Sequence, residues 1–281
     1  MVMDLAVDLI HATVQLEQPL GDGTRTVGTG FLISAPGADG KPRTVLITAN
    51  HVLQKMPGAT ARIGYRISNP DGSWSYSPQQ VKIRGGDGEQ LWTQHPNRDV
   101  AAMVIKAPPE FAKAAIPENY LAAEDSFEKY QISAGDEMMA LGFPRGLSAN
   151  SAGFPILRSG RVASYPLSPA KVFPTFLLDF SVFPGNSGGP VFVSRGLRTG
   201  PMIQASTAEP QAEAGFIAGL LTQQVELNNE RLEIGIVTHA RYIRETIALM
   251  QNPDLAPTTM AEGMTAVSGS RTASAEEAAR D

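Results

Sequence analysis

The stretch Gly185-Asn186-Ser187-Gly188-Gly189-Pro190 places one serine between glycines. It lies between two short apolar runs, residues 176–181 and 191–193, which predict buried strands. Glycine on both sides of the serine lets the backbone adopt unusual dihedral angles and lets a ligand approach the main chain closely. Backbone N–H groups can then surround an oxyanion beside a nucleophilic serine. The same stretch also fits a flexible loop, so its meaning depends on the rest of the chain.

Two further segments supply the residue types that a nucleophilic serine needs. Residues 44–51 form an apolar, β-branched run that ends in His51, and residues 97–105 begin another apolar run with Asp99. The order histidine, acid, serine is that of the chymotrypsin class, whereas subtilisins and α/β-hydrolases use other orders. Two alternatives stay open at this point: His51 could be a core or surface histidine, and Asp99 a solvated acid at a strand end.

The chain resembles a trypsin-fold (chymotrypsin-like) serine peptidase and is most similar to the bacterial HtrA-type and glutamyl-endopeptidase-like branch. The matching stretches are residues 28–33, 47–51, 98–102, 135–144, 159–163, 184–190, 215–220 and 234–238. The resemblance covers about residues 5–250, nearly all of the chain. It implies an all-β fold of two six-stranded antiparallel β-barrels with the active site in the cleft between them, followed by a C-terminal helix. HtrA proteins carry a PDZ domain after this helix, and residues 252–281 are too few to form one, so we expect none.

The resemblance also divides the chain. We expect an N-terminal barrel at residues 1–110, a connector at 111–130, a C-terminal barrel with the terminal helix at 131–251, and a disordered tail at 252–281. Alternating apolar residues at 10–16, the region of His11, and at 61–67 predict half-buried strands.

The terminal helix is predicted from one apolar face. This face consists of Tyr242, Ile243, Ile247 and Met250, and Thr238 is a candidate N-cap.

The resemblance assigns a catalytic role to each residue of the set. Ser187 would be the nucleophile, and His51 the base that takes its proton and later donates it to the leaving amine. Asp99 would hold the imidazole in the right tautomer and stabilise the imidazolium. The backbone N–H groups of Gly185 and Ser187 would form the oxyanion hole. The remaining histidines, His11, His95 and His239, have no metal-ligand spacing, so we expect no metal and no cofactor.

Asn186 departs from the animal digestive members of the family. Those proteins have an aspartate before the nucleophile, which pairs with a newly cut N-terminal ammonium group. An amide carries no charge and cannot form this ion pair, so we expect activation without N-terminal cleavage. By resemblance, a control step would act on the loops around the oxyanion hole, at residues 145–154, 183–186 and 223–232, through loop ordering or an activating partner protein.

The resemblance further places the pocket for the residue before the scissile bond. The expected lining residues are Ser181, Val182, Leu221, Thr222, Gln223, Gln224, Gly235 and Val237. Trypsin has an aspartate at the position of Ser181, and glutamyl peptidases have a histidine near the position of Leu221. A charged substrate side chain would therefore lack a partner in this pocket. We expect a small or medium apolar side chain instead.

The composition of the chain argues against some classes of binding partner. A formal net charge of −5 and the lack of a basic, aromatic-rich block argue against nucleic-acid binding, and no apolar run reaches the ~18 residues of a membrane helix. The absence of cysteine and of a secretory signal favours a bacterial, cytoplasmic protein, or a periplasmic or secreted one if a signal peptide has been removed. The expected partner is a protein or peptide substrate.

Four interpretations follow from these patterns. The first is a serine endopeptidase that works through an acyl-enzyme. The alternative from another class is a catalytically silent trypsin-fold module used for binding or as a scaffold, although such proteins usually lack a member of the catalytic set. The third is a peptidase that rests inactive until a partner releases it. The fourth is an esterase, because the same residues can acylate esters.

Overall fold

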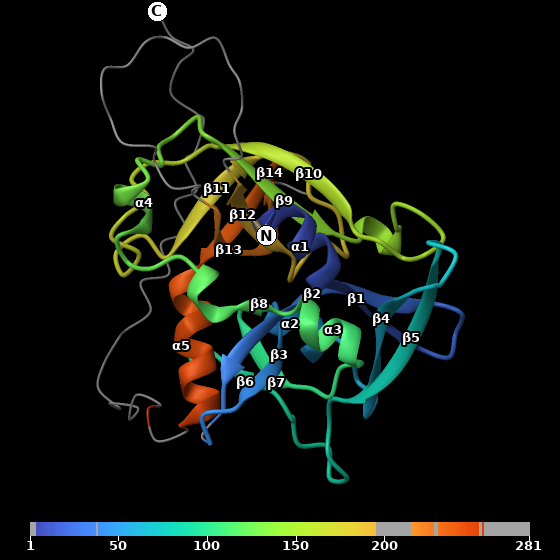
Figure 1. Ribbon diagram of the computed structural model, residues 1–281. Coiled ribbons are helices and arrows are strands. Elements are labelled where there is room, and N and C mark those ends of the chain that lie inside the picture. Colours follow the sequence, from blue (N-terminus) through green and yellow to red (C-terminus); the bar gives the residue numbers. More distant parts are fainter. Residues whose placement is uncertain (1–3, 38, 195–214, 228–229, 253–254, 256–281) are drawn as a thin grey trace, which may run out of the picture.

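Strands dominate the protein and form two sheets (Figure 1). The computed structural model describes residues 4–37, 39–194, 215–227, 230–252 and 255; of residues 223–231 it describes only the backbone, where it describes them at all. The expected tail at 252–281 lies outside these residues, apart from two of them. None of the described helices is long and apolar enough to cross a membrane.

The N-terminal half is an eight-stranded sheet. Its strands are β1 (Thr13–Pro19), β2 (Arg25–Pro36), β3 (Pro42–Thr48), β4 (Thr60–Ser68), β5 (Trp74–Lys82), β6 (Thr93–Gln94), β7 (Ala101–Val104) and β8 (Ile116–Pro117). They pair antiparallel in the order β5-β4-β1-β2-β3-β7-β6, and β8 pairs parallel with β2. The strand expected at residues 61–67 is β4.

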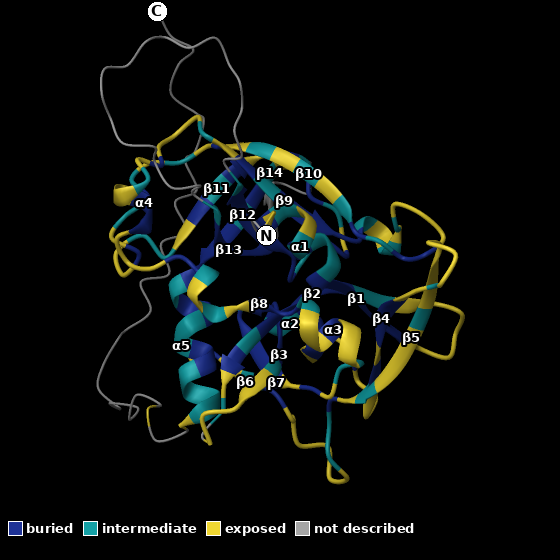
Figure 2. Ribbon diagram, in the orientation of Figure 1, coloured by how far each residue is buried: buried dark blue, intermediate teal, exposed yellow. Residues whose placement is uncertain are grey.

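This sheet differs from the closed six-stranded barrel that the resemblance implies. Within the described residues its pairing is an open path whose end strands, β5 and β6, do not pair with each other. β5 is polar, contains Pro78 and lies mostly exposed (Figure 2), which suits an edge strand. β6 has only two residues to offer as a partner.

The C-terminal half is the six-stranded closed barrel that was expected. Its strands are β9 (Glu137–Gly142), β10 (Ile156–Val162), β11 (Thr175–Asp179), β12 (Pro190–Ser194), β13 (Gly215–Leu227) and β14 (Glu230–His239). The order around the barrel is β10-β11-β14-β13-β12-β9. The apolar runs at 176–181 and 191–193 therefore contribute β11 and β12, which are consecutive in the sequence and flank the glycine-rich stretch, but are not paired in the barrel.

The first element is a helix, α1 (Leu5–Ala12), where a strand was expected. The Asp4 side chain accepts hydrogen bonds from two backbone N–H groups of the first turn, as an N-cap does. Leu5, Leu9 and Ala12 form its buried face with helical spacing. The alternation at 10–16 thus reflects a helix end followed by β1, and His11 lies on the helix.

Short helices connect the strands. They are α2 (Asn50–Gln54), α3 (Pro109–Ala114), η1 (Glu118–Tyr120), α4 (Ser126–Lys129) and η2 (Pro144–Gly146). The expected terminal helix is α5 (Ala240–Gln251), which buries Tyr242, Ile243 and Ile247. Its N-cap is His239, whose side chain makes no capping bond, rather than Thr238, which lies on β14. Figure 1 shows α5 beside β6 and β7 of the N-terminal half.

Candidate active site

His51 and Asp99 form a hydrogen-bonded pair in the N-terminal half. β3 ends at Thr48, and His51 follows in α2. The distance between His51 Nδ1 and Asp99 Oδ2 is 2.6 Å, and the backbone N–H of His51 donates to Asp99 Oδ1 at 2.9 Å. Because a carboxylate only accepts hydrogen bonds, Nδ1 carries the proton. Nε2 is then the nitrogen that is free to take a proton.

The environment of Asp99 keeps its carboxyl group ionised. Burial by itself raises the pKa of Asp99. The hydrogen bond and charge of the His51 ring, together with backbone N–H groups of His51 and Asn50, lower the pKa of Asp99 more strongly, and the result lies below the ordinary value. A negative Asp99 can therefore stabilise a positive His51.

The loop before Asp99 is held by α5. The backbone N–H of Asn97 donates to His95 Nδ1 at 3.2 Å, so the other ring nitrogen of His95 carries the proton. This Nε2 lies 3.0 Å from Glu245 Oε2 on α5. The His95 ring also meets the Tyr242 ring edge to face at 5.3 Å. His95 thus links the terminal helix to the segment that carries Asp99.

Ser187 lies in a turn between β11 and β12 that packs against the end of β3. Gly188 has φ +92°, and a Cβ atom there would lie 2.0 Å from the Thr29 carbonyl oxygen and 2.3 Å from Thr48 Oγ1. Only glycine fits this contact. The turn therefore meets β3 three residues before His51. Ser187 is half-buried, and its hydroxyl makes no hydrogen bond to any described residue; such bonds often tighten only when substrate binds.

Thr29 on β2 fixes this turn by two hydrogen bonds. Its backbone N–H donates to the Ser187 carbonyl at 2.9 Å, and its hydroxyl donates to the Gly185 carbonyl at 2.6 Å. The hydroxyl also accepts from the Phe143 N–H at 3.1 Å. The Thr48 hydroxyl in turn donates to the Thr29 carbonyl at 2.7 Å. The sequence analysis did not single out Thr29; a hydroxyl within the apolar run of β2 is the signal that could have found it.

The backbone around Gly185 orients two neighbouring N–H groups, those of Gly185 and Ser187. Gly185 has φ +98°, and a Cβ atom there would lie 2.3 Å from the Phe143 carbonyl oxygen. The Pro184 carbonyl accepts from the Arg145 N–H at 2.6 Å. Since the two groups of a trans peptide point in opposite directions, the Gly185 N–H points away from Arg145. In the described part of the chain, the N–H groups of Gly185 and Ser187 have no acceptor. Two unpaired donors so close together suit a negative oxygen.

Asn186 forms no ion pair, as its amide chemistry requires. Its side chain is buried, and Nδ2 has no partner among the described residues. The backbone is nevertheless fixed, because its N–H donates to the Phe183 carbonyl at 3.0 Å and its carbonyl accepts from the Gly189 N–H at 3.1 Å. The conformation of the turn is thus maintained by main-chain bonds.

Several residues expected in the specificity pocket meet around Gly235 on β14. A Cβ atom there would lie 3.0 Å from Val182 Cγ2 and 3.1 Å from both Leu221 Cδ1 and Phe180 Cε1. The Leu221 backbone joins these side chains to the turn that carries Ser187, since its carbonyl accepts from the Gly188 N–H at 2.7 Å. Phe180 was not expected here. Its place beside Ser181 in the sequence was the available signal.

The other expected pocket residues are more dispersed. Ser181 is half-buried next to Val182. Thr222 is buried, and its hydroxyl donates to the Ile236 carbonyl at 3.2 Å. Val237 packs against Gly219 rather than Gly235. Gln223 and Gln224 lie on β13, but their side chains are outside the described part.

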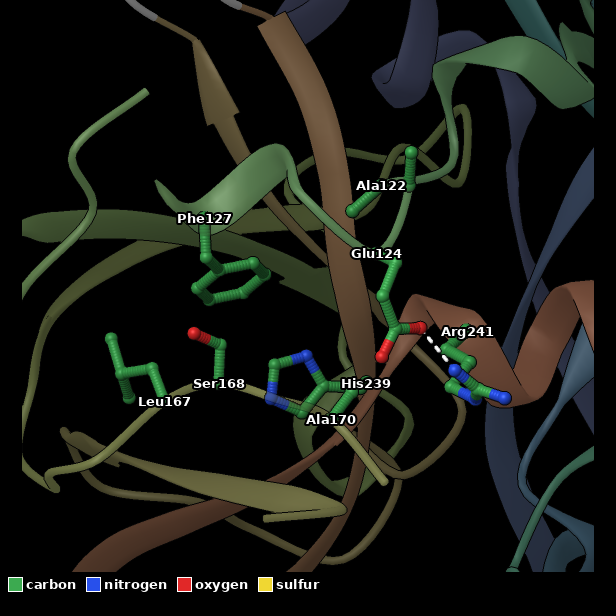
Figure 3. A pocket seen from close by; sticks show the side chains of 9 residues that line it. Ala122, Glu124, Phe127, Leu167, Ser168, Ala170, His239 and Arg241 are labelled. Atoms are coloured by element: carbon green, nitrogen blue, oxygen red, sulfur yellow. Dashed lines mark hydrogen bonds and ion pairs between the residues drawn. The ribbon is translucent and has the colours of Figure 1, made fainter. Parts of the chain in front are cut away.

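A small pocket beside α5 is separate from this site (Figure 3). His239 lies in it, with ring centroids 4.7 Å from Phe127 and 5.0 Å from Phe176, and its Nε2 has no described hydrogen-bond partner. Burial is the main influence on the pKa of His239 and lowers it to about 4. A hydrogen bond to the Leu167 backbone and the charge of Glu124 act in the opposite direction and raise this pKa. The space holds about one water molecule. Neither here nor elsewhere among the described residues do three or more His, Asp or Glu side chains gather as metal ligands would.

The sequence is similar to a known family of protein domains. The family model of the trypsin-like peptidase domain matches residues 28–200, more than half of the chain. No curated protein matches the sequence.

Two solved structures illustrate the similarity of fold. The HtrA-type protease AlgW with a tripeptide is 16% identical, with a TM-score of 0.53, and the match covers 89% of this chain and 64% of that one. The active form of the Rv3671c protease from M. tuberculosis is also 16% identical, with a TM-score of 0.50, and the match covers 87% of this chain and 82% of that one. The chain thus spans less than two-thirds of the AlgW chain.

Proposed function

The chain belongs to the family of trypsin-like peptidase domains, and we propose that it is a serine endopeptidase that hydrolyses peptide bonds through an acyl-enzyme. The observation that carries this proposal is the His51–Asp99 hydrogen bond together with the N–H groups of Gly185 and Ser187, which have no acceptor among the described residues. The lobes that contribute to the site would be residues 1–110 and 131–251, joined by the connector at 111–130.

The proposed reaction has two stages. In the first, Ser187 Oγ attacks the carbonyl carbon of the substrate while its proton moves to His51 Nε2. The electron pair of the carbonyl moves to its oxygen, which the Gly185 and Ser187 N–H groups stabilise. The C–N bond then breaks, and His51 returns the proton to the leaving amine. In the second stage, His51 takes a proton from water as the water oxygen attacks the acyl carbon. The ester bond to Ser187 Oγ then breaks, His51 returns the proton to Ser187 Oγ, and the acid is released.

The pocket favours a small apolar side chain before the scissile bond. Val182, Leu221 and Phe180 are all buried and approach one another at Gly235, so the space between them is narrow. Their side chains offer no hydrogen-bond partner to a charged group. Discrimination within such a pocket amounts to ~1–3 kcal/mol per methylene group, so the preference would be moderate.

We propose that the site needs no activating partner, because the loop that orients the oxyanion peptide is held within the chain. Gln15 Nε2 on β1 donates to the Gly146 carbonyl at 3.0 Å. Arg66 on β4 donates to the Gly153 carbonyl at 3.1 Å, and its guanidinium is buried. Both bonds connect the N-terminal sheet to residues 145–154. Arg145 can therefore fix Pro184 without help from a second protein.

Labelling with a fluorophosphonate probe tests the proposal. The purified wild-type chain alone should be modified at Ser187, and mass spectrometry of the peptide should locate the label. Ser187→Ala should remove it while thermal unfolding stays unchanged. A folded wild-type protein that takes no label would favour the silent binding module or a partner-gated peptidase. Parallel peptide and ester substrates would separate a peptidase from an esterase.

A further inference from the structure

Two arginines converge on Phe183, two residues before Gly185. The distance from Cζ to the Phe183 ring centroid is 5.4 Å for Arg145 and 5.6 Å for Arg158. Arg158 Cζ also lies 5.4 Å from the ring centroid of Phe180, which would line the proposed apolar pocket. Both guanidinium groups therefore lie beside the turn that carries Gly185, and Arg158 also lies beside the proposed pocket.

Among the described residues, these two guanidinium groups have no carboxylate or carbonyl acceptor, unlike the other described arginines. Every other arginine whose side chain is described donates to a carboxylate or a backbone carbonyl: Arg25, Arg43, Arg62, Arg66, Arg84, Arg98, Arg161, Arg241 and Arg244. Among the described residues, Arg145 and Arg158 contact only aromatic rings. A guanidinium has five N–H donors, and stacking on a ring leaves them at its edge. No described residue therefore occupies the N–H donors of either group.

The backbone of Arg145 is held in place. Its backbone has φ +53°, a left-handed conformation that costs a non-glycine residue energy, and its N–H is bonded to the Pro184 carbonyl. Arg158 lies on β10 inside the closed barrel pairing, where its position follows from the strand register with Ala140. Both guanidinium groups are thus held near the Phe183 ring, one by a loop and one by a strand.

We propose that Arg145 and Arg158 bind the carboxylate of an Asp or Glu side chain in the peptide substrate, at a position flanking the residue in the apolar pocket. The carboxylate matches the fork of donors that arginine offers. It cannot be the pocket residue itself, because Val182, Leu221 and Phe180 would leave a buried charge unpaired. This inference rests on the proposed peptidase activity and specifies its substrate as a peptide with an acidic residue beside a small apolar one.

The expected preference is moderate because the arginines are accessible. Arg145 is exposed and Arg158 is half-buried, so solvent and salt weaken their attraction for a carboxylate. For a charge-assisted pair in this setting we expect ~3- to 20-fold higher kcat/KM for a peptide with Glu than for its Gln counterpart. The ratio should fall toward one as the salt concentration rises above ~0.5 M.

A matched peptide series tests the inference. Peptides with Val before the scissile bond carry Glu or Gln at each of the two positions on either side, and kcat/KM is measured for each pair with the wild-type chain. One position should show the Glu preference. Arg158→Gln should reduce this ratio to below about twofold, and Arg158→Glu should favour a Lys-containing peptide over the Glu one. Arg161→Gln is the matched control, since Arg161 is on the same strand but donates to the Gly135 carbonyl.

The outcomes separate this inference from the proposed function. Hydrolysis of the whole series without a Glu preference at any position would overturn the arginine site and leave the peptidase intact. A preference that Arg158→Gln and Arg161→Gln reduce equally would also overturn it. Absence of both hydrolysis and Ser187 labelling would overturn the peptidase activity, and the inference with it. Thermal unfolding of each variant establishes that a lost preference does not come from a misfolded chain.

Discussion

Replacing Thr29 by valine removes one hydroxyl and should disable the site without touching the three proposed catalytic side chains. Valine has nearly the same shape, so the backbone N–H bond from residue 29 to the Ser187 carbonyl can persist. The lost interactions are the donation to the Gly185 carbonyl at 2.6 Å and the acceptance from the Phe143 N–H at 3.1 Å. The Gly185 carbonyl is then free to rotate, and with it the turn that carries Ser187.

The size of the effect follows from burial. Thr29 and Phe143 have no exposed surface, and Gly185 is buried, so water cannot replace the lost partner easily. Each buried group left unpaired costs ~1–3 kcal/mol, which gives about 2–6 kcal/mol lower stability for the two groups. A shift of about 1 Å in a reacting group can cost ~10²-fold in rate. We therefore expect Thr29→Val to lower kcat by about 100-fold or more, with KM within about threefold of wild type.

Steady-state kinetics below the unfolding transition measure this change, together with the rate of fluorophosphonate labelling at Ser187. Thr48→Val is the matched control, because the Thr48 hydroxyl is equally buried but donates only to the Thr29 carbonyl. It should destabilise by ~1–3 kcal/mol and lower kcat by less than about tenfold. Thr29→Ser keeps the hydroxyl and should restore most of the labelling rate.

Two results would refute this reasoning. One is a Thr29→Val enzyme with wild-type kcat at a temperature where it is fully folded. The other is an equal loss of kcat in Thr29→Val and Thr48→Val, which would reduce the role of Thr29 to general stability.

Two further predictions concern the titrating groups. Asp99→Asn should lower kcat by about 10⁴-fold at neutral pH, because an amide can favour the wrong His51 tautomer; an effect below about tenfold on kcat would contradict the assigned role. His239, whose pKa is lowered from 6.5 to about 4, favours the folded state fully above pH 6.5, and this contribution is lost as the pH falls toward 4. Urea unfolding should therefore show a loss of ~2 kcal/mol between pH 7 and pH 5 in wild type that is missing in His239→Gln, and equal pH dependence in both proteins would contradict the assignment.

Part of the fold could be predicted from the sequence. The closed C-terminal barrel, which the family resemblance implied, and α5, which was predicted from its apolar face, are both confirmed. Helix α1 was missed, since an alternating apolar pattern over a few residues fits a helix end joined to a strand as well as a strand alone. The open N-terminal sheet depends on the polar edge strand β5, which the family pattern does not reveal. The assignment of the catalytic residues stays a prediction.

The contacts that order the site could not be predicted from the sequence, because they join residues that are far apart in the chain. Thr29 and Gly185 are 156 residues apart, and Arg145 approaches Phe183 and Pro184 only once the barrel has closed. A single buried hydroxyl or an unpaired guanidinium has no local sequence pattern that distinguishes it from its neighbours. Such roles arise from tertiary packing.

The position of α5 has a consequence for the order of events during translation. Glu245 holds His95 in the segment before Asp99, and Arg244 donates to the Ala122 carbonyl in the connector, yet both residues are synthesised after Ser187. Because synthesis proceeds from the N-terminus, a nascent chain can expose His51, Asp99 and Ser187 while this support is still missing. The support for the loop before Asp99 would then form only after α5 has been synthesised and has packed against the N-terminal half.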